Sequence, residues 1–349
     1  MGKNRQNFSL QSHVHCAILR NEKIFKKHLI LCIERYIIHS SNQSRKETHT
    51  MKKVIKVISV ILAIAMVACC FASCGQKDNN PTDGAAPTSK TETKAVVKII
   101  DISLTDEQYG FAVSKNQPEL LTKLNEFVAE IKKDGTLDAI MAKYFQGGTP
   151  EGVQSATLDK SKDQLVVSTN AEFAPFEYKD GDTFYGVDLE IVAAFAKKLG
   201  KELVIKDIDF NSVLNEVESG NADMSASGLT VNEERLKQVN FSETYYTASQ
   251  YVIAPAADTK FDSCKTREDM EKALAELGSD VAIGFQSGTT AQSYVEGDED
   301  WGFTGLKTQA KGYDSGALAV QDMINGNIQY VIIDEAPAKV IVDNFNNAK

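Results

Sequence analysis

Residues 165–205 read LVVSTNAEFAPFEYKDGDTFYGVDLEIVAAFAKKLGKELVI, and this stretch decides the fold class. It begins with a short β-branched run at 165–169, which is typical of a buried strand. Over 186–199 the apolar residues recur at helical spacing, and Gly200 is suited to end that helix. A second apolar run follows at 203–205. A strand, a helix and a strand in this order indicate an α/β fold.

The same alternation continues further along the chain. Four more apolar runs are predicted to be strands with helices between them, at 222–225, 251–254, 281–285 and 330–333. Ligands of such sheets gather in a crevice at the carboxyl ends of the strands. The sequence has no tandem repeat, no glycine-rich phosphate loop and no run of basic residues, so we expect no cofactor and no metal.

The residues in front of this unit are also predicted to be structured. Short apolar runs at 95–100 and 109–113 are typical of strands. A helix is expected over 118–133, where five apolar residues fall on one stripe. A second helix is expected over 137–145, with Thr136 as its N-cap. Both helices are predicted to cover one face of the domain.

Two stretches have the composition of flexible segments. Residues 75–94 are rich in Pro, Gly, Thr, Asn and Lys, which is typical of a tether. Residues 146–164, QGGTPEGVQSATLDKSKDQ, hold three Gly and one Pro and are expected to form a linker. A flexible linker of this length spans about 25 Å.

The first fifty residues differ in composition from the rest. They hold nine Lys or Arg against three acidic residues, whereas the whole chain of 349 residues has 38 Lys+Arg against 48 Asp+Glu. They also hold all five histidines. Because no histidine follows Met51, a Ser-His-Asp or Cys-His catalyst, a histidine zinc site and a histidine pH switch are excluded from the remainder. Its acidity also argues against nucleic acid as a partner.

Residues 51–74, MKKVIKVISVILAIAMVACCFASC, have the pattern of an export signal, with three lysines, an apolar run and small residues. The apolar run at 57–68 is too short to span a bilayer, which needs about 20 residues. The Phe-Ala-Ser-Cys ending resembles a bacterial lipoprotein box and implies that Cys74 is acylated, with Cys69 as the alternative.

An export signal does not function from position 51, so we expect residues 1–50 to be untranslated sequence before a mis-called start. The alternative is a cytoplasmic segment followed by an internal membrane anchor at Met51. If the signal is cleaved, Cys264 is the only cysteine left besides the acylated one, and no intramolecular disulfide is expected.

Polar and aromatic residues lie after the predicted strands, where ligands of α/β sheets bind. The candidate site residues are Asn170, Phe173, Phe210, Ser227, Gly228, Thr230, Arg235, Gln286, Thr289, Thr290 and Asp334. A zwitterionic α-amino acid needs a cation for its carboxylate, an anion for its ammonium group, and hydroxyls or amides for the remaining lone pairs. Arg235 can bind a carboxylate through two parallel hydrogen bonds, and Asp334 can accept from an ammonium group. The two phenylalanines are suited to enclose the apolar stem of the ligand.

Each candidate also has a purely structural interpretation. Arg235 lies in a Glu-Glu-Arg run, as on a solvated helix face, and the phenylalanines are typical of a core. Asp334 is suited to cap a helix, Asn170 to form a turn, and residues 286–290 to form a capped turn. Their recurrence at successive strand ends favours one shared binding site.

Four stretches resemble the family 3 extracellular solute-binding proteins, the polar amino-acid-binding proteins of ABC importers. They are TNAEFAPFEYKDGDTFYGVDLEIVAAFAKKLG (169–200), DFNSVLNEVESGNADMSASGLTVNEERLKQVNFSETYY (209–246), GFQSGTT (284–290) and VIIDEAP (331–337). The resemblance implies that Phe173 and Phe210 stack on the ligand and that Ser227, Gly228 and Thr230 form the turn that faces it. It also implies that Arg235 and Thr290 contact the ligand carboxylate and that Asp334 accepts a hydrogen bond from the ligand ammonium group.

The resemblance also bears on the ligand. Asn170 stands where many family members have an acidic group for the ligand side chain. Together with Gln286 and Ile333, this departure favours a polar, uncharged side chain.

The implied fold is a two-lobed clamp of the type II periplasmic-binding-protein class, with the ligand between the lobes. In the family the domain ends with a strand, a return into the first lobe and two helices, and here residues 97–145 have that pattern but precede the rest. We therefore expect a circular permutant in which 146–164 joins the original termini. Lobe 1 is expected over 165–255 and lobe 2 over 256–349, with 95–145 completing both. A broken gene and a swapped dimer are the alternatives.

The expected function is that of an extracytoplasmic lipoprotein that captures an amino acid and delivers it to the permease of an ABC importer. It is expected to be a monomer, anchored to the bacterial cell membrane through the lipid on Cys74, and not an enzyme. Two alternatives remain: a periplasmic dehydratase of the cyclohexadienyl or arogenate type on the same fold, and an amino-acid sensor without transport. The dehydratase needs a proton donor near the substrate ring, and the candidate set offers no acid beyond Asp334 and Glu335.

Overall fold

The structure is a computed structural model that describes residues 95–348. The predicted upstream segment 1–50, the export signal 51–74 with Cys69 and Cys74, and the tether 75–94 lie outside the described residues. Within 95–348, no helix has both the length and the apolar character needed to cross a membrane.

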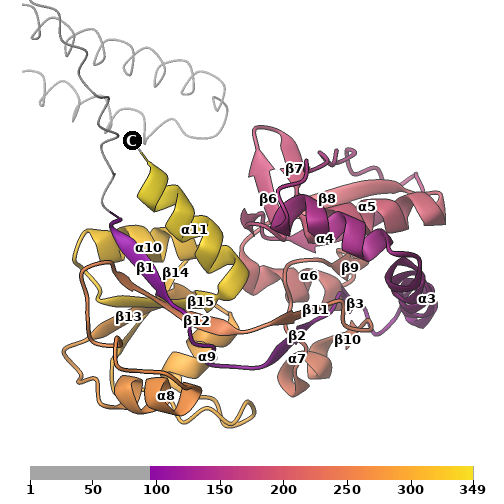
Figure 1. Ribbon diagram of the computed structural model, residues 1–349. Coiled ribbons are helices and arrows are strands. Elements are labelled where there is room, and N and C mark those ends of the chain that lie inside the picture. Colours follow the sequence, from indigo (N-terminus) through magenta and orange to yellow (C-terminus); the bar gives the residue numbers. More distant parts are fainter. Residues whose placement is uncertain (1–94, 349) are drawn as a thin grey trace, which may run out of the picture. The chain divides into compact units, whose positions relative to one another are not determined.

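Lobe 1 is built on a five-stranded sheet in the order β10-β3-β9-β4-β8 (Figure 1). The strands are β3 Ala112–Val113, β4 Gln164–Thr169, β8 Glu202–Asp207, β9 Met224–Ser225 and β10 Asn240–Phe241. β4 runs parallel to β8 and β9, whereas β3 is antiparallel to both β9 and β10. Its helices are α3 Pro118–Asp134, α4 Thr136–Phe145, α5 Val187–Leu199, η1 Phe210–Ser212, α6 Val213–Glu218 and α7 Glu233–Gln238.

Lobe 2 is built on a second five-stranded sheet in the order β1-β12-β15-β13-β14. The strands are β1 Val97–Ile100, β12 Gln250–Pro255, β13 Ala282–Gln286, β14 Gln309–Tyr313 and β15 Tyr330–Asp334. β13 is parallel to β14 and β15, and β12 is antiparallel to β15 and β1. Its helices are α8 Arg267–Ala275, α9 Thr290–Glu296, α10 Gly316–Ile324 and α11 Glu335–Asn347. The two sheets therefore share one pattern of pairing, in which β1 of lobe 2 corresponds to β10 of lobe 1.

The start of β1 is held against the end of α11 (Figure 1). The side-chain oxygen of Asn346 accepts hydrogen bonds from the backbone N–H groups of Val96 (2.8 Å) and Val97 (3.1 Å). The side-chain nitrogen of Asn346 donates to the carbonyl of Val97 at 3.0 Å. Two segments that are about 250 residues apart in the sequence are thus neighbours in lobe 2.

The helices of the upstream segment pack on lobe 1. α3 buries Leu124, Phe127, Val128 and Ile131, four members of the predicted stripe, each contributing about 1.5–3 kcal/mol. α3 ends where Gly135 takes a left-handed conformation, with φ of 84°. The prediction that Thr136 caps the next helix was wrong. Thr136 is the first residue of α4, and its backbone N–H donates to the Asp134 carboxylate at 2.9 Å.

The single strand expected over 109–113 is divided into two in the structure. β2 Glu107–Tyr109 pairs with β11 Tyr246–Ala248, whereas β3 pairs with the sheet of lobe 1. Between them the backbone N–H of Gly110 donates to the carbonyl of Leu229 at 3.0 Å. The chain thus changes pairing partners at Gly110, which a short apolar run does not reveal.

Residues 146–163 pack on lobe 1, so the prediction of a flexible linker was wrong in this respect. Val153 is buried and pairs with Phe184 in an isolated bridge. The backbone N–H of Ala156 donates to the carbonyl of Leu203 at 2.8 Å. Glycine and proline content predicted the irregular path, but the buried valine keeps the segment on the domain surface.

The boundary between the lobes also differs from the expected one. β12, Gln250–Pro255, lies in the sheet of lobe 2, although 165–255 was predicted to be lobe 1. The chain therefore crosses between the lobes just after β11, and it crosses again between β1 and β2. We call these two crossings, together with the β2–β11 pair that adjoins both of them, the hinge. Cys264 is a free, buried thiol in lobe 2.

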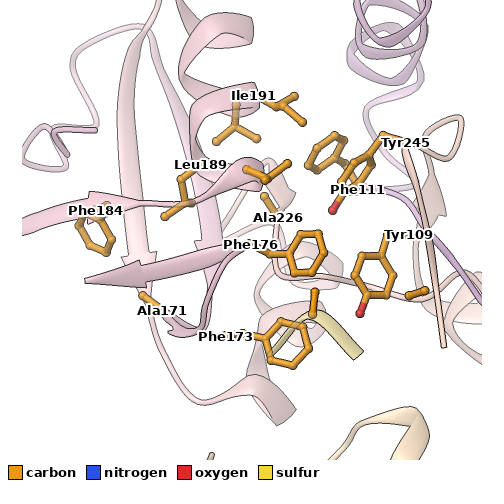
Figure 2. Close-up of a cluster of buried hydrophobic side chains, with 14 of the residues drawn as sticks. Tyr109, Phe111, Ala171, Phe173, Phe176, Phe184, Leu189, Ile191, Ala226 and Tyr245 are labelled. Carbon is orange, nitrogen blue, oxygen red and sulfur yellow. The ribbon is translucent and has the colours of Figure 1, made fainter. Parts of the chain in front are cut away.

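An aromatic cluster in lobe 1 supports the hinge. Figure 2 shows Tyr109 beside Phe176, with ring centroids 5.2 Å apart, and Phe111 against Tyr245, where the rings stack at 4.4 Å. Phe173 lies next to Phe176 at 6.1 Å. It belongs to a three-stranded sheet that the sequence patterns did not predict. The strands are β5 Glu172–Phe173, β6 Glu177–Asp180 and β7 Thr183–Tyr185.

Candidate functional site

A small cavity between the lobes is lined by eight of the eleven predicted site residues. The lining residues are Phe173, Phe210, Gly228, Thr230, Arg235, Thr289, Thr290 and Asp334. The first five come from lobe 1 and the last three from lobe 2. Residues chosen at successive strand ends therefore meet in one place, as expected for an α/β sheet.

Arg235 lies in α7, the helix capped by the side chain of Asn232. One guanidinium nitrogen donates to the carbonyl of Thr230 at 2.8 Å, and the other terminal nitrogen donates to the carbonyl of Gly288 in lobe 2 at 3.1 Å. The guanidinium carbon lies 5.7 Å from the centre of the Phe210 ring. Burial lowers the pKa of Arg235, and the carboxyl groups of Glu107 and Asp334 oppose that shift. The half-buried guanidinium thus lines the cavity between the lobes instead of lying on a solvated helix face.

Two threonine hydroxyls, one from each lobe, face the same carboxylate. Thr230 and Thr290 are nearly fully buried, and their hydroxyl oxygens are 3.4 Å apart. Both donate to one oxygen of Glu107, each at 2.7 Å. Glu107 is on β2 and was not among the predicted site residues.

Asp334 is the last residue of β15 and the N-cap position of α11, yet its side chain makes no cap hydrogen bond. Its carboxylate instead accepts from the hydroxyl of Tyr109 at 2.5 Å. Burial raises the pKa of Asp334 to about 7, and the nearby Glu107 adds to the shift. Burial also raises the pKa of Tyr109 well above its usual range, so this phenol remains a hydrogen-bond donor.

The three remaining predicted residues lie beside the cavity and hold its walls together. The side-chain nitrogen of Gln286, in lobe 2, donates to the side-chain oxygen of Asn170, in lobe 1, at 2.8 Å. The backbone N–H of Asn170 donates to the Ser227 hydroxyl at 3.0 Å. Thr289, which lines the cavity, donates from its hydroxyl to the carbonyl of Gln286 at 2.7 Å and does not cap α9.

Two glycines allow the cavity walls to approach closely. Gly228 has φ of +51°, and a Cβ placed there would lie 2.8 Å from the ring of Phe173. Gly288 has φ of +81°, and a Cβ there would lie 2.1 Å from the side-chain oxygen of Asn211 in the other lobe. Both positions combine a left-handed backbone with contact to a neighbour, so a larger residue is strained there.

A buried pair of carboxyl groups supports the Ser227-Gly228 turn from behind. The Ser227 hydroxyl donates to Glu177 at 3.1 Å, and the backbone N–H of Gly228 donates to Asp188 at 3.0 Å. Tyr245 also donates its hydroxyl to Asp188. Burial raises the pKa of Glu177 well above its usual range and that of Asp188 to about 7. A protonated carboxyl group is therefore expected beneath this turn at neutral pH.

The sequence reasoning missed Glu107, Tyr109 and Gln250. Glu107 and Tyr109 lie on β2 of the hinge, and Gln250 is the first residue of β12, so none of them follows the carboxyl end of a strand in the two five-stranded sheets. The only local signal for Glu107 and Tyr109 is the run TDEQYG at 105–110, whose polar residues stand just before the strand predicted over 109–113. Contact with residues 123 to 225 positions away, such as Thr230, Thr290 and Asp334, is a property of the tertiary fold.

Two sheets of the same topology, joined by two crossings and facing one cavity, define a two-lobed α/β protein of the type II periplasmic-binding-protein class. The chain belongs to the bacterial extracellular solute-binding proteins, family 3, whose family model matches residues 12–147 and 165–302. The family and the two-lobed α/β fold class predicted from the sequence are therefore confirmed, whereas the expected circular permutation stays a prediction.

Individual relatives match over parts of their length. The chain is 41% identical to the arginine-binding extracellular protein ArtP of Bacillus subtilis (strain 168) over 103 residues, which is 30% of this chain and 40% of that protein. It is 28% identical to ABC transporter arginine-binding protein 1 of Escherichia coli (strain K12) over 175 residues, 50% of this chain and 64% of that protein. Among solved structures, an ancestral arginine-binding protein bound to arginine is 32% identical, with 54% of this chain and 76% of that chain covered and a TM-score of 0.45. The chain thus spans less than two thirds of the length of both named curated relatives.

Proposed function

We propose that this protein captures an α-amino acid between its lobes and delivers it to the permease of an ABC importer. The observation that carries the proposal is the convergence of Arg235, Thr230, Thr290 and Asp334, two from each lobe, on one cavity. Arg235 is the group for the ligand carboxylate, since two of its five N–H donors bind carbonyls of the described residues and three are left for a ligand. Asp334 is the acceptor for the ammonium group.

The buried charges favour a cationic amino acid, and arginine is the first candidate. The cavity region holds two acidic side chains, Glu107 and Asp334, and one guanidinium, Arg235. A zwitterion adds no net charge, whereas a cationic side chain balances the second carboxylate when both acids are ionised. The names of the curated relatives from Bacillus subtilis and Escherichia coli, both arginine-binding, support the same choice. This proposal replaces the polar, uncharged side chain favoured by Asn170 and Gln286.

Export and membrane anchoring complete the proposed function. Residues 51–74 act as a lipoprotein signal in this proposal, and the lipid on Cys74 holds the protein at the extracytoplasmic face of the membrane. A single acyl chain binds membranes weakly, so a diacylated cysteine is the anchor that suits stable attachment. The protein acts as a monomer beside its permease.

The dehydratase alternative is less favoured by the site. Asp334 is the only acidic residue among those that line the cavity, and it already accepts a hydrogen bond from Tyr109. In the proposed binding role Asp334 is the acceptor for the ligand ammonium group, and no second acidic residue lines the described cavity as a separate proton donor for a substrate ring. Conversion of prephenate to phenylpyruvate by the purified protein would reverse this preference.

Ligand binding is expected to raise the melting temperature in a screen of the twenty amino acids. A ligand at a hundred times its Kd adds about 2.7 kcal/mol of stability, which corresponds to about 5–10 °C for a domain of this size. L-Arginine is expected to give the largest shift. Agmatine, which lacks the carboxylate, serves as the matched control and is expected to give none. The absence of a shift with all twenty amino acids contradicts the proposed function.

We also propose that the domain is a circular permutant of the family fold. In lobe 1 the third parallel strand, β9, is followed by α7 and the edge strand β10. In lobe 2 the corresponding β15 is followed by α11, and the edge strand is β1, whose start is bound by Asn346 of α11. The order of elements in space is therefore continuous from α11 to β1. The family model matches the chain in two blocks, which leave the proposed joint at 148–164 outside both.

Reordering the chain tests the permutation. A variant that joins residue 348 to residue 95 through a short linker and is opened within 146–163 is expected to fold and to bind the same ligand. Its melting temperature is expected to lie within about 5 °C of the parent, because loop closure changes stability by little. Light scattering on the parent is expected to give the mass of a monomer. A dimeric parent supports the swapped arrangement instead, and a reordered chain that does not fold refutes the permutation.

A further inference from the structure

Glu107 accepts hydrogen bonds from four side chains that come from three parts of the fold. Its first carboxylate oxygen accepts from the hydroxyl of Thr105 at 2.6 Å and from the side-chain nitrogen of Gln250 at 3.0 Å. Its second oxygen accepts from the hydroxyls of Thr230 and Thr290, each at 2.7 Å. Glu107 is 4% exposed, so water does not compete strongly for these bonds.

The two oxygens of this carboxylate have different surroundings. The first is bound by Thr105 of the hinge and by Gln250, the first residue of β12 in lobe 2, directly after the second crossing. The second is bound by Thr230 of lobe 1 and Thr290 of lobe 2. When the lobes separate, the distance between the two threonines increases, and at least one of these bonds breaks. Hydrogen bonds to a charged acceptor are about twice as strong as neutral ones.

We propose that Glu107 is the closure latch of the cleft: a hinge carboxylate that stabilises the closed arrangement by binding one hydroxyl from each lobe. Glu107 acts on the ligand through Thr230 and Thr290 and is therefore a positioning residue. Once the lobes close over the ligand, the latch slows their separation. The effect on ligand binding rests on the proposed function, whereas the effect on the lobes does not.

The latch also assigns roles to the hydroxyl groups. A threonine hydroxyl has one proton to donate, and both Thr230 and Thr290 donate theirs to Glu107. Their lone pairs remain as acceptors, which suits them to the ammonium group of the ligand rather than to its carboxylate. The ligand carboxylate is then bound by Arg235. Glu107 thereby sets the orientation in which the α-amino acid enters the cleft.

The only tryptophan of the chain is placed to report on closure. Trp301, in lobe 2, lines a groove at the cleft together with Val231, Asn232 and Leu236 of lobe 1, and the groove also reaches Glu107. Separation of the lobes opens this groove and exposes the indole ring. Quenching of its fluorescence by acrylamide therefore measures opening without a label and without a ligand.

The test compares Glu107→Leu and Glu107→Gln with Asp106→Asn in the intact chain. Leucine fills similar space but accepts no hydrogen bond. Glutamine keeps one acceptor oxygen for the two hydroxyls, and its amide nitrogen can donate to Gln250, whose side-chain oxygen has no partner among the described residues. Asp106 is the exposed residue next to Glu107 in the sequence, and it pairs with Arg267. Its substitution by Asn removes the same charge as the Glu107 variants but leaves the hydrogen bonds of Glu107 in place.

With Glu107→Leu, acrylamide quenching of Trp301 in ligand-free protein is expected to increase at least about twofold. The dissociation rate of L-arginine, followed by stopped-flow fluorescence, is expected to rise about 10- to 100-fold with an almost unchanged association rate. Glu107→Gln is expected to restore most of the slow dissociation, and Asp106→Asn to match the unsubstituted protein.

Unchanged quenching in Glu107→Leu overturns the latch. The latch is also overturned if the association rate falls by the same factor as the dissociation rate rises, because a latch acts only after the ligand has docked. If Glu107→Leu does not fold, Thr290→Val removes one of the two hydroxyls with a side chain of the same shape and is expected to increase quenching in the same way. If the unsubstituted protein binds no arginine, the proposed ligand is wrong, and the quenching result still decides the latch.

Discussion

Arg235→Met is expected to raise the Kd for the amino-acid ligand by at least about 100-fold. Methionine keeps an unbranched stem against Phe210 but removes the planar group that binds the ligand carboxylate. Removal of one partner from a buried charged pair costs about 3–5 kcal/mol, and each 1.4 kcal/mol is a factor of ten in Kd. Isothermal titration calorimetry with L-arginine measures the change. The melting temperature of the ligand-free variant is expected to stay within a few degrees of the parent.

Arg267→Met is the matched control. Arg267 is the other arginine of the described residues, and it binds Asp106 and the carbonyls of Ser103 and Thr105, outside the cavity. The substitution removes the same charge and is expected to change the Kd by less than about threefold. If Arg235→Met binds as tightly as the parent, the carboxylate is held elsewhere and the candidate site is wrong.

The α/β alternation was predictable because the strands and helices of both lobes have strong periodic patterns. The helix predicted over 186–199 forms as α5, which buries Leu189, Val192 and Phe195 and ends at Gly200 in the left-handed conformation. The strands β4, β8, β12, β13 and β15 fall on the predicted apolar runs within a few residues. These elements have one face or both faces in the core, so burial dictates their residue types.

The elements that the sequence did not predict are short or depend on distant partners. β10 has two residues, and β14, Gln309–Tyr313, is an exposed edge strand of mixed composition. The division of 109–113 into β2 and β3 depends on pairing with β11 and β9, each more than 100 residues away. Local propensity carries no information about such pairing.

The difference between local patterns and distant partners also explains which site residues were predictable from the sequence. Strand ends of an α/β sheet can be located from the sequence, and eight residues chosen in this way line the cavity. Glu107 and Tyr109 lie inside a hinge strand, and they become functional candidates only because the tertiary fold places them against Thr290 and Asp334. The hinge therefore contributes polar groups to the site as well as the freedom to open it.

Asp334 gives the cleft a pH dependence that is opposite for stability and for binding. The pKa of this buried carboxyl is raised from 3.8 to about 7. Because the pKa of Asp334 is higher in the folded protein than in the unfolded chain, the protonated carboxyl group stabilises the fold. This stability is fully present when the pH is below the pKa of the unfolded chain, and it is lost as the pH rises through about 7. The ammonium group of a ligand, in contrast, requires the ionised carboxylate. Ligand affinity is therefore expected to increase as the pH rises over the same range.

The expected result is a Kd for L-arginine that rises about tenfold for each pH unit below about 6, with release of a proton on binding near pH 7. Calorimetry in buffers with different heats of ionisation measures the proton. Asp334→Asn is expected to raise the Kd about 100-fold and to abolish the proton release.

Asp188→Asn is the control that separates the pH dependence of ligand binding from the pH dependence of protein stability. Asp188 has a pKa raised by burial to about 7 as well, but it lies beneath the Gly228 turn and does not line the cavity. Its substitution is expected to flatten the decline of the melting temperature between pH 4 and 7 while the proton release on binding persists. If binding exchanges no proton in the parent and the Kd is independent of pH, Asp334 is not the acceptor for the ammonium group. The ligand must then present its cation to Glu107 or to the two threonine hydroxyls, which are the next acceptors in the cleft.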